Sequence, residues 1–183
     1  MKQLTVAVVG GSIAGCSAAI LLRRAGHDVH VYERSPGGLV GRGGGIGTPL
    51  PVLQGLMDED VVDSDMPYLD ADAMPFIVRT DDAPETGVVP WEMPMQLAAF
   101  HWSALWGQLR RRVPDDRYHR SAVVTDVTDV ADDGLERMTV SFEDGDAVTV
   151  DLVVFADGYQ SLGRRLLFPD VPLRYRGYQL WRG

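Results

Sequence analysis

The chain has 183 residues, 45% of them hydrophobic, which is enough for one substantial buried core. Its net charge of −9 argues against a nucleic-acid or anionic-membrane surface, because those partners select clustered positive charge. The local exception, RRR at residues 110–112, is expected at the solvated end of a helix. A single cysteine excludes an internal disulfide. The sequence has no run of about 18 or more apolar residues, so no membrane span is predicted. Without a recognisable signal peptide, a cytoplasmic protein is expected.

The chain opens with a valine-rich apolar run at residues 4–9, which is typical of a strand buried on both faces. Apolar residues then recur with helical spacing over residues 13–25, and Gly26 is a plausible end of that helix. Residues 28–34 alternate as a second strand. This order predicts a right-handed βαβ unit with parallel strands.

The turn of this unit lies within VVGGSIAG, residues 8–15, and has the pattern of a phosphate-binding loop. Gly10 permits the tight turn, and Gly15 lets the helix pack against the strand. Ser12 stands where the usual G-x-G-x-x-G has its second glycine. Serine is small enough for a pyrophosphate to approach, and its hydroxyl can donate to a phosphate oxygen. The helix N-terminus adds amide donors and a positive dipole end.

An acidic residue completes the fingerprint, because Glu33 ends the second strand 18 residues after Gly15. A carboxylate there can accept hydrogen bonds from both ribose hydroxyls of an adenosine and would repel a 2′-phosphate. The unit therefore favours the adenosine of FAD or NAD over that of NADP. The alternative is an ordinary turn with a surface glutamate. Cys16, on the apolar side of the helix, is expected to be a core residue and not a nucleophile.

The next segment, residues 34–56, is rich in glycine, which is tolerated where a ligand approaches the backbone closely. Arg42 within it can reach a pyrophosphate or the adenine side of a cofactor. The alternative is a mobile surface loop. Further along, the pattern predicts strands at residues 74–80 and 87–91 and a helix over 102–112.

The later chain predicts an antiparallel meander. Three alternating runs lie between residues 117 and 150, with Asp144 and Gly145 forming a hairpin turn between the second and third. They lead into an apolar strand, DLVVFADG, that ends in Asp157 and Gly158. Plain NAD dehydrogenases favour repeated βαβ units, so a meander that feeds a strand ending in Asp-Gly favours a flavoprotein.

Three segments resemble the FAD-dependent aromatic hydroxylases, the single-component flavoprotein monooxygenases of the para-hydroxybenzoate hydroxylase type. They are VVGGSIAG with LLRRAGHDVHVYERS, GRGGGIG at residues 41–47, and DLVVFADGYQSLGRR at residues 151–165. Within that family the chain is most similar to the 2,6-dihydroxypyridine hydroxylase-like group, and the closing YRGYQLWRG at residues 175–183 resembles that group as well. The resemblance covers almost the whole chain and is weakest between residues 57 and 100.

The resemblance implies an α/β fold: a Rossmann-like FAD-binding fold of the glutathione reductase type, with a β-meander and an incomplete β-sheet substrate lobe. It implies an FAD-binding domain over residues 1–73 with 101–170, and parts of the substrate-side lobe over 74–100 and 171–183. The implied cofactor-binding residues are Gly10, Ser12, Ile13, Ala14 and Gly15 for the pyrophosphate, Glu33 for the ribose, Arg34 and Arg42 for the adenosine and phosphates, and Asp157 and Gly158 for FAD and NAD(P)H.

Three further residues are of interest. Arg164 is expected either to pair with Asp157 or to be a solvated helix arginine. The resemblance places the start of the 102–112 helix near the flavin, which draws attention to His101 and Trp102.

The implied function is hydroxylation of a small aromatic or heteroaromatic substrate. NADH or NADPH reduces FAD, and a C4a-hydroperoxyflavin formed with oxygen transfers the oxygen atom. This chemistry needs no metal, and no catalytic residue is identified. The family's Gly-Asp motif and most of its substrate domain do not occur in the sequence. Either a second chain supplies them or the chain is a truncation. The alternatives are a non-catalytic flavin-binding module and an NAD-dependent oxidoreductase.

Overall fold

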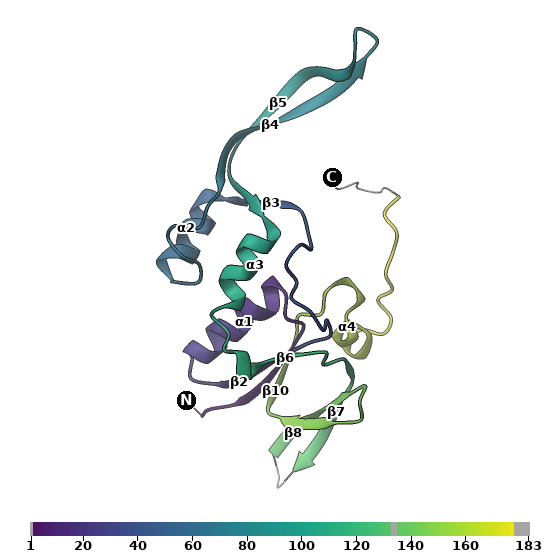
Figure 1. Cartoon of the computed structure of the whole chain (residues 1–183). Helices are drawn as coiled ribbons and strands as arrows, with labels where there is room; N and C mark the ends of the chain where they lie inside the picture. Colours follow the sequence, from purple (N-terminus) through teal and green to yellow (C-terminus); the bar gives the residue numbers. More distant parts are fainter. Residues whose placement is uncertain (1, 133–134, 178–183) are drawn as a thin grey trace.

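The computed structural model describes residues 2–132 and 135–177, and its centre is a four-stranded parallel sheet with the order β10–β1–β2–β6 (Figure 1). The central strand β1 (Thr5–Val9) pairs with β10 (Leu152–Phe155) on one side and with β2 (Asp28–Glu33) on the other. The edge strand β6 (Tyr118–Arg120) pairs with β2. Helices α1 (Ile13–Arg24) and α3 (Trp102–Arg110) lie on one side of this sheet (Figure 1). Strands β7 (Val124–Asp132) and β8 (Leu135–Phe142) lie on the other side.

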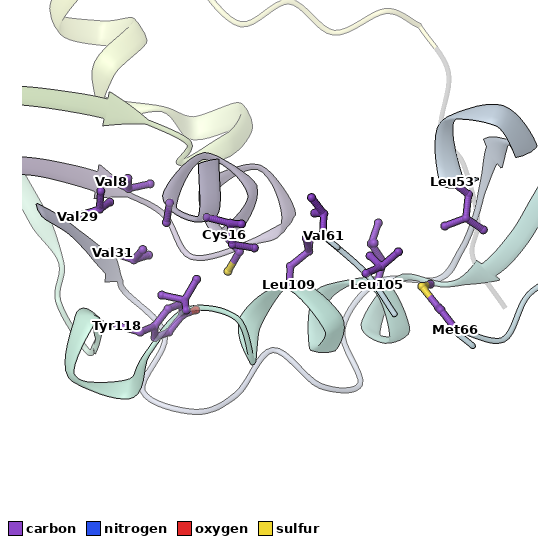
Figure 2. Packing of buried hydrophobic residues seen from close by; sticks show 14 of the residues in the cluster. Val8, Cys16, Val29, Val31, Leu53, Val61, Met66, Leu105, Leu109 and Tyr118 are labelled. Atoms are coloured by element: carbon purple, nitrogen blue, oxygen red, sulfur yellow. The ribbon is translucent and has the colours of Figure 1, made fainter. Parts of the chain in front are cut away.

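The predicted βαβ unit is confirmed, with α1 (Ile13–Arg24) between the two parallel strands. Both faces of β1 are buried: Val6 and Val8 belong to the core on the helical side, whereas Ala7 packs toward the meander. This explains why the strand is apolar along its whole length. The helical-side core also contains Cys16, as predicted for that residue (Figure 2). Burial raises the pKa of the Cys16 thiol to about 12, so the sulfur stays protonated at neutral pH.

The glycine-rich segment contains two elements that the sequence pattern did not predict. They are β3 (Gly45–Pro49) and α2 (Leu50–Asp58). Proline in the first turn is compatible with the start of α2, and Leu53 is completely buried in the core beside residues of the following loop. The segment is therefore a loop only up to β3.

A second sheet, with the order β3–β5–β4, carries a long hairpin formed by β4 (Leu69–Thr80) and β5 (Ala83–His101). The hairpin extends away from the rest of the molecule (Figure 1). The predicted strands at residues 74–80 and 87–91 lie inside these longer ones. The strands were underestimated because much of the hairpin is exposed on both faces and its register shifts three times, so apolar and polar residues do not alternate cleanly.

The helix predicted over residues 102–112 is α3 (Trp102–Arg110). Residues 110–112 end this helix as predicted, but only the Arg111 side chain is solvated, at 51% exposure. The guanidinium of Arg110 lies 4.0 Å from the centroid of the Tyr118 ring. Arg112 donates to the carboxylates of Asp60 at 3.0 Å and Asp63 at 2.6 Å. These basic side chains therefore connect α3 to the parallel sheet and to the loop after α2.

The meander is confirmed as β7 (Val124–Asp132), β8 (Leu135–Phe142) and β9 (Ala147–Val150), which pair antiparallel in that order. The first alternating run, however, divides into two elements. Its beginning forms β6 of the parallel sheet, after the short 3₁₀ helix η1 (Asp115–Arg117), and only its end forms β7.

The last described elements follow the Asp-Gly pair at residues 157 and 158. A 3₁₀ helix η2 (Gly158–Gln160) and a short helix α4 (Leu162–Leu167) follow β10. Residues 171–177 form no helix or strand, and the rest of the lobe expected over 171–183 lies outside the described residues. None of the helices in the described ranges is long and apolar enough to cross a membrane.

Candidate functional site

A cleft of about 780 Å³ lies at the carboxyl ends of β1, β2 and β10, and its size suits a cofactor. Most of the predicted cofactor-binding residues line it. These are Gly10, Ser12, Ala14, Glu33, Arg34, Arg42, Asp157 and Gly158. Ile13 and Gly15 belong to the same turn but do not line the cleft, because they start α1 and pack inward. The tertiary fold therefore brings the early fingerprint and the late Asp-Gly pair to one place.

The turn that connects β1 to α1 depends on two glycines. Gly10 has φ +99°, and a Cβ atom there would lie only 2.5 Å from the carbonyl oxygen of Ala156 at the end of β10. A Cβ atom at Gly15 would overlap the carbonyl oxygen of Gly10. Ser12 is the N-cap of α1, and its side chain makes no capping hydrogen bond. The first turn of α1 is therefore a suitable site for an anion.

Glu33 closes the other side of the turn and is only 7% exposed. Its Oε2 accepts from the backbone N–H of Gly11 at 2.8 Å, and its Oε1 accepts from the N–H of Ser35 at 2.8 Å. Each carboxylate oxygen keeps a further lone pair, since an ionised carboxylate offers about four acceptor positions. Glu33 can thus hold the turn and bind ligand hydroxyls at the same time.

Asp157 also lines the cleft and lies two residues after the end of β10. Its Oδ2 accepts from the backbone N–H of Leu162 at 2.6 Å. Its Oδ1 is buried and has no hydrogen-bond partner among the described residues. A buried acceptor without a partner costs free energy, which a donor on a bound ligand would recover.

The expected pair between Arg164 and Asp157 is not the contact that forms. Arg164 donates to the carbonyl oxygen of Tyr159 at 2.6 Å instead. The backbone turn of η2 brings this carbonyl within reach, whereas the Asp157 carboxylate is directed to the start of α4. Arg164 nevertheless lines the cleft.

The rim of the cleft is basic although the protein is acidic. Arg34, Arg42, Arg164 and Arg165 all line it. Arg42 also donates to the hydroxyl of Ser35 at 3.1 Å. A cluster of guanidinium groups beside a helix N-terminus favours a phosphorylated ligand.

Trp102 lines the cleft, and His101 does not. His101 is the N-cap of α3, and its ring accepts from the backbone N–H of Ser103 at 3.2 Å. Trp106 stacks on Trp102 with ring centroids 6.1 Å apart. Trp91 is exposed on the hairpin, and Trp181 lies outside the described residues.

The histidines of the parallel sheet form a separate cluster. His30 contacts His119 through Nδ1 and Nε2 at 2.9 Å, and Arg117 donates to Nε2 of His30 at 2.6 Å. Burial, together with the charges of His30 and Arg117, lowers the pKa of His119. Neither histidine lines the cleft, and within residues 2–132 and 135–177 no group of three or more His, Cys, Asp or Glu side chains could hold a metal ion.

Sequence reasoning missed several lining residues: Ser35, Leu39, and Ala122 to Val124. The backbone N–H of Ala122 donates to the carbonyl of Glu33 at 3.0 Å, which places this segment over the end of β2. Ser35 could have been found from its position directly after the acidic fingerprint. Residues 122–124 carry no local signal.

Comparison with known proteins adds an independent result. Residues 8–44 match a family model described as an NAD(P)-binding Rossmann-like domain. The chain is 34% identical to 2,6-dihydroxypyridine 3-monooxygenase of Paenarthrobacter nicotinovorans over 97% of its own length and 42% of the length of that protein. The chain therefore spans less than half of this relative.

Solved structures agree with the sequence match. The structure of 2,6-dihydroxypyridine-3-hydroxylase from Arthrobacter nicotinovorans is similar with a TM-score of 0.76 and 30% identity, covering 92% of this chain and 40% of that one. The R204Q variant of Klebsiella pneumoniae HpxO complexed with FAD has a TM-score of 0.68 at 21% identity, covering 90% and 42%, and shares the fold. The expected Rossmann-like α/β fold is confirmed.

Proposed function

We propose that this chain, which is similar in sequence and fold to 2,6-dihydroxypyridine 3-monooxygenase, is the N-terminal part of an FAD-dependent aromatic monooxygenase and that its cleft binds FAD. The observation that carries the proposal is the convergence of Ser12, Glu33 and Asp157 on one cleft from the ends of three parallel strands. A dinucleotide needs these three contacts at separated points along its length.

The turn and its neighbours hold the ADP half of the cofactor. The amides at the start of α1, with Ser12 and Ala14, receive the pyrophosphate, while Gly10 and Gly15 keep the turn tight and Ile13 anchors it to the core. Glu33 binds the ribose hydroxyls, and Arg34 and Arg42 neutralise phosphate charge from the rim.

Asp157 and Gly158 hold the middle of the cofactor. The Oδ1 atom of Asp157 accepts from a hydroxyl of the ribityl chain, because this buried acceptor has no partner among the described residues. Gly158 is exposed and lets the ligand approach the backbone.

Bound FAD supplies the redox and oxygen chemistry of hydroxylation. The residues of this chain bind and orient the cofactor and exclude water from its phosphate end. The reductant is NADH or NADPH, and the substrate is a small aromatic or heteroaromatic compound. The site at Glu33 belongs to FAD, so its carboxylate does not discriminate between the two reductants.

We further propose two structural units. Residues 1–73 with 101–170 form the FAD-binding domain, and residues 74–100 and 171–183 belong to a substrate-side β lobe. Hydroxylation needs more of that lobe than this chain provides, since the chain spans 42% of its dihydroxypyridine-hydroxylating relative. The remainder, with the Gly-Asp motif, comes from the same polypeptide or from a second chain.

The one buried free cysteine agrees with a cytoplasmic location.

The other candidate is an NAD-dependent oxidoreductase, which the match to an NAD(P)-binding model favours. Titration of the chain with FAD and with NAD⁺ separates the flavoprotein from the NAD-dependent oxidoreductase. Calorimetry measures both affinities, and the visible absorption of flavin reports FAD binding. We expect FAD to bind more tightly. Tighter binding of NAD⁺ would contradict the flavoprotein assignment.

Asp157→Asn tests the ligand-facing acceptor. The amide oxygen can still cap α4 at Leu162, while the amide nitrogen replaces the free Oδ1 acceptor with a donor. We expect the Kd for FAD to rise roughly tenfold or more, because a hydrogen bond to a charged acceptor is lost. The exposed Asp129→Asn is the control and should keep the wild-type Kd. An unchanged Kd in Asp157→Asn would remove Asp157 from the binding site.

A further inference from the structure

The carbonyl group of Gly11, in the phosphate turn, is held by buried side chains from distant parts of the chain. Nε1 of Trp106 donates to this oxygen at 3.0 Å, and the hydroxyl of Tyr118 donates to it at 2.9 Å. The thiol of Cys16 adds a weaker contact at 3.3 Å. The two strong donors come from α3 and β6, 95 and 107 residues along the chain from Gly11.

Neither donor lines the cleft, and both are fixed in place. Trp106 is 4% exposed and stacks on Trp102. Tyr118 is 6% exposed, lies in the same core as Cys16 (Figure 2), and is covered by the guanidinium of Arg110. Burial raises the pKa of Tyr118, so its hydroxyl remains a donor throughout the physiological pH range.

The direction of this carbonyl decides the direction of the next amide. The described chain contains no cis peptide bond, and in a trans peptide the C=O of Gly11 and the N–H of Ser12 point to opposite sides. Trp106 and Tyr118 hold the carbonyl toward the core, so the N–H of Ser12 is directed away from the core. Ser12 is the member of this pair that lines the cleft. The N–H of Gly11 is bound separately by Glu33.

We propose that Trp106 and Tyr118 are positioning residues that aim the Ser12 amide at the phosphate group of the ligand. The inference rests on the proposed function for the identity of that ligand, the FAD pyrophosphate. Without the two donors the Gly11–Ser12 peptide samples other orientations in the free protein. Ligand binding must then reorder it, and this cost appears in the dissociation constant.

Tyr118→Phe and Trp106→Phe test the inference. Tyr118→Phe keeps the ring and removes only the hydroxyl donor, so it isolates the hydrogen bond, whereas Trp106→Phe removes the indole N–H together with part of a buried ring. The first measurement is the exchange broadening of the Ser12 amide signal in ¹⁵N NMR of the ligand-free chain. We expect broadening in both variants and none in the wild type. The second is the Kd for FAD, which we expect to rise roughly threefold to tenfold in each variant and further in the double variant. Trp91→Phe and Tyr68→Phe, at exposed positions, are matched controls and should match the wild type in both measurements.

The outcomes are separable. Wild-type Ser12 dynamics and wild-type Kd in both variants, with only a lower Tm, would show that Trp106 and Tyr118 are ordinary core residues and would overturn the inference. If the wild type binds no FAD, the proposed function fails. The Ser12 signal of the ligand-free chain still decides whether the two donors orient the turn.

Discussion

At the scale of single residues, Glu33 links the architecture of the turn to ligand binding. Its two oxygens accept from the backbone N–H groups of Gly11 and Ser35, and the side chain also borders the cleft. Buried backbone donors are rarely left without partners, since the lost hydration is not recovered. The carboxylate therefore shapes the turn before any ligand arrives.

Replacement of Glu33 by glutamine is expected to weaken both the folded turn and the binding of FAD. The amide group can accept from one of the two N–H groups but presents its own donor to the other, which is left unpaired. We expect a loss of about 1–3 kcal/mol in the free energy of unfolding and at least a roughly tenfold rise in the Kd for FAD. Urea denaturation and flavin fluorescence titration measure the two effects. The exposed Glu92→Gln serves as control, and equal values for Glu33→Gln and the wild type would refute this dual role.

At the scale of elements, the joint between the meander and the parallel sheet depends on Asp151, which precedes β10. Its Oδ2 accepts from the backbone N–H of Thr5 at 2.7 Å, and its Oδ1 lies 3.3 Å from Nε of Arg137 on β8. The hydrogen bond from Thr5, with the charge of Arg137, lowers the pKa of the Asp151 carboxyl. One carboxylate thus links β1 of the parallel sheet to β8 of the meander.

The lowered pKa gives this joint a defined pH dependence. A carboxyl whose pKa is lower in the folded state stabilises the fold above its unfolded value of 3.8, and the stabilisation is lost as the pH falls toward the folded value. We therefore expect Asp151→Asn to have a lower Tm than the wild type at pH 7 and a difference that shrinks on acidification. Thermal unfolding across the acid range measures this. The exposed Asp70→Asn should show no such difference, and a constant deficit in Asp151→Asn would argue against the role of its charge.

At the scale of the whole molecule, the β4–β5 hairpin carries one of two groups of exposed large apolar side chains, and the other lies within residues 159–175. None of the exposed apolar residues of the hairpin lines the cleft. The Phe76 and Trp91 rings stack 4.7 Å apart and are 41% and 54% exposed. Other large apolar side chains exposed on the same hairpin are Leu69, Met74, Ile77, Val78, Val88 and Val89. A surface of this kind marks a site of contact with other structure.

We expect the hairpin to bind the hydrophobic dye ANS. The double variant Phe76→Ser with Trp91→Ser should lower ANS fluorescence and leave the Kd for FAD unchanged, because neither residue lines the cleft. Leu21→Ser, which removes an exposed leucine on α1, is the control and should retain the dye signal. Unchanged ANS fluorescence in the double variant would show that the dye binds elsewhere, such as at the exposed apolar side chains of residues 159–175, and would contradict this expectation.

Short-range patterns predicted a large part of this structure. The βαβ unit, the meander and the strand before Asp157 were predicted because buried strands and amphipathic helices repeat apolar residues with a local period. The residues of the glycine fingerprint were predicted because the backbone of a phosphate turn imposes a small residue at Gly10 and Gly15. The FAD-type family resemblance depended on the same local segments.

The sequence by itself thus determined the elements with strong periodicity, the glycines of the turn and the resemblance to FAD-dependent aromatic hydroxylases. Tertiary structure alone decided that three residues after η1 join the parallel sheet and that residues 122–124 lie beside Glu33 at the cleft. It also decided that Trp106 and Tyr118 donate to the Gly11 carbonyl. The physical reason is the distance along the sequence over which each kind of interaction acts. A periodic pattern records which face of an element is buried, whereas a hydrogen bond between residues about one hundred positions apart depends on how the elements pack, which no local spacing encodes.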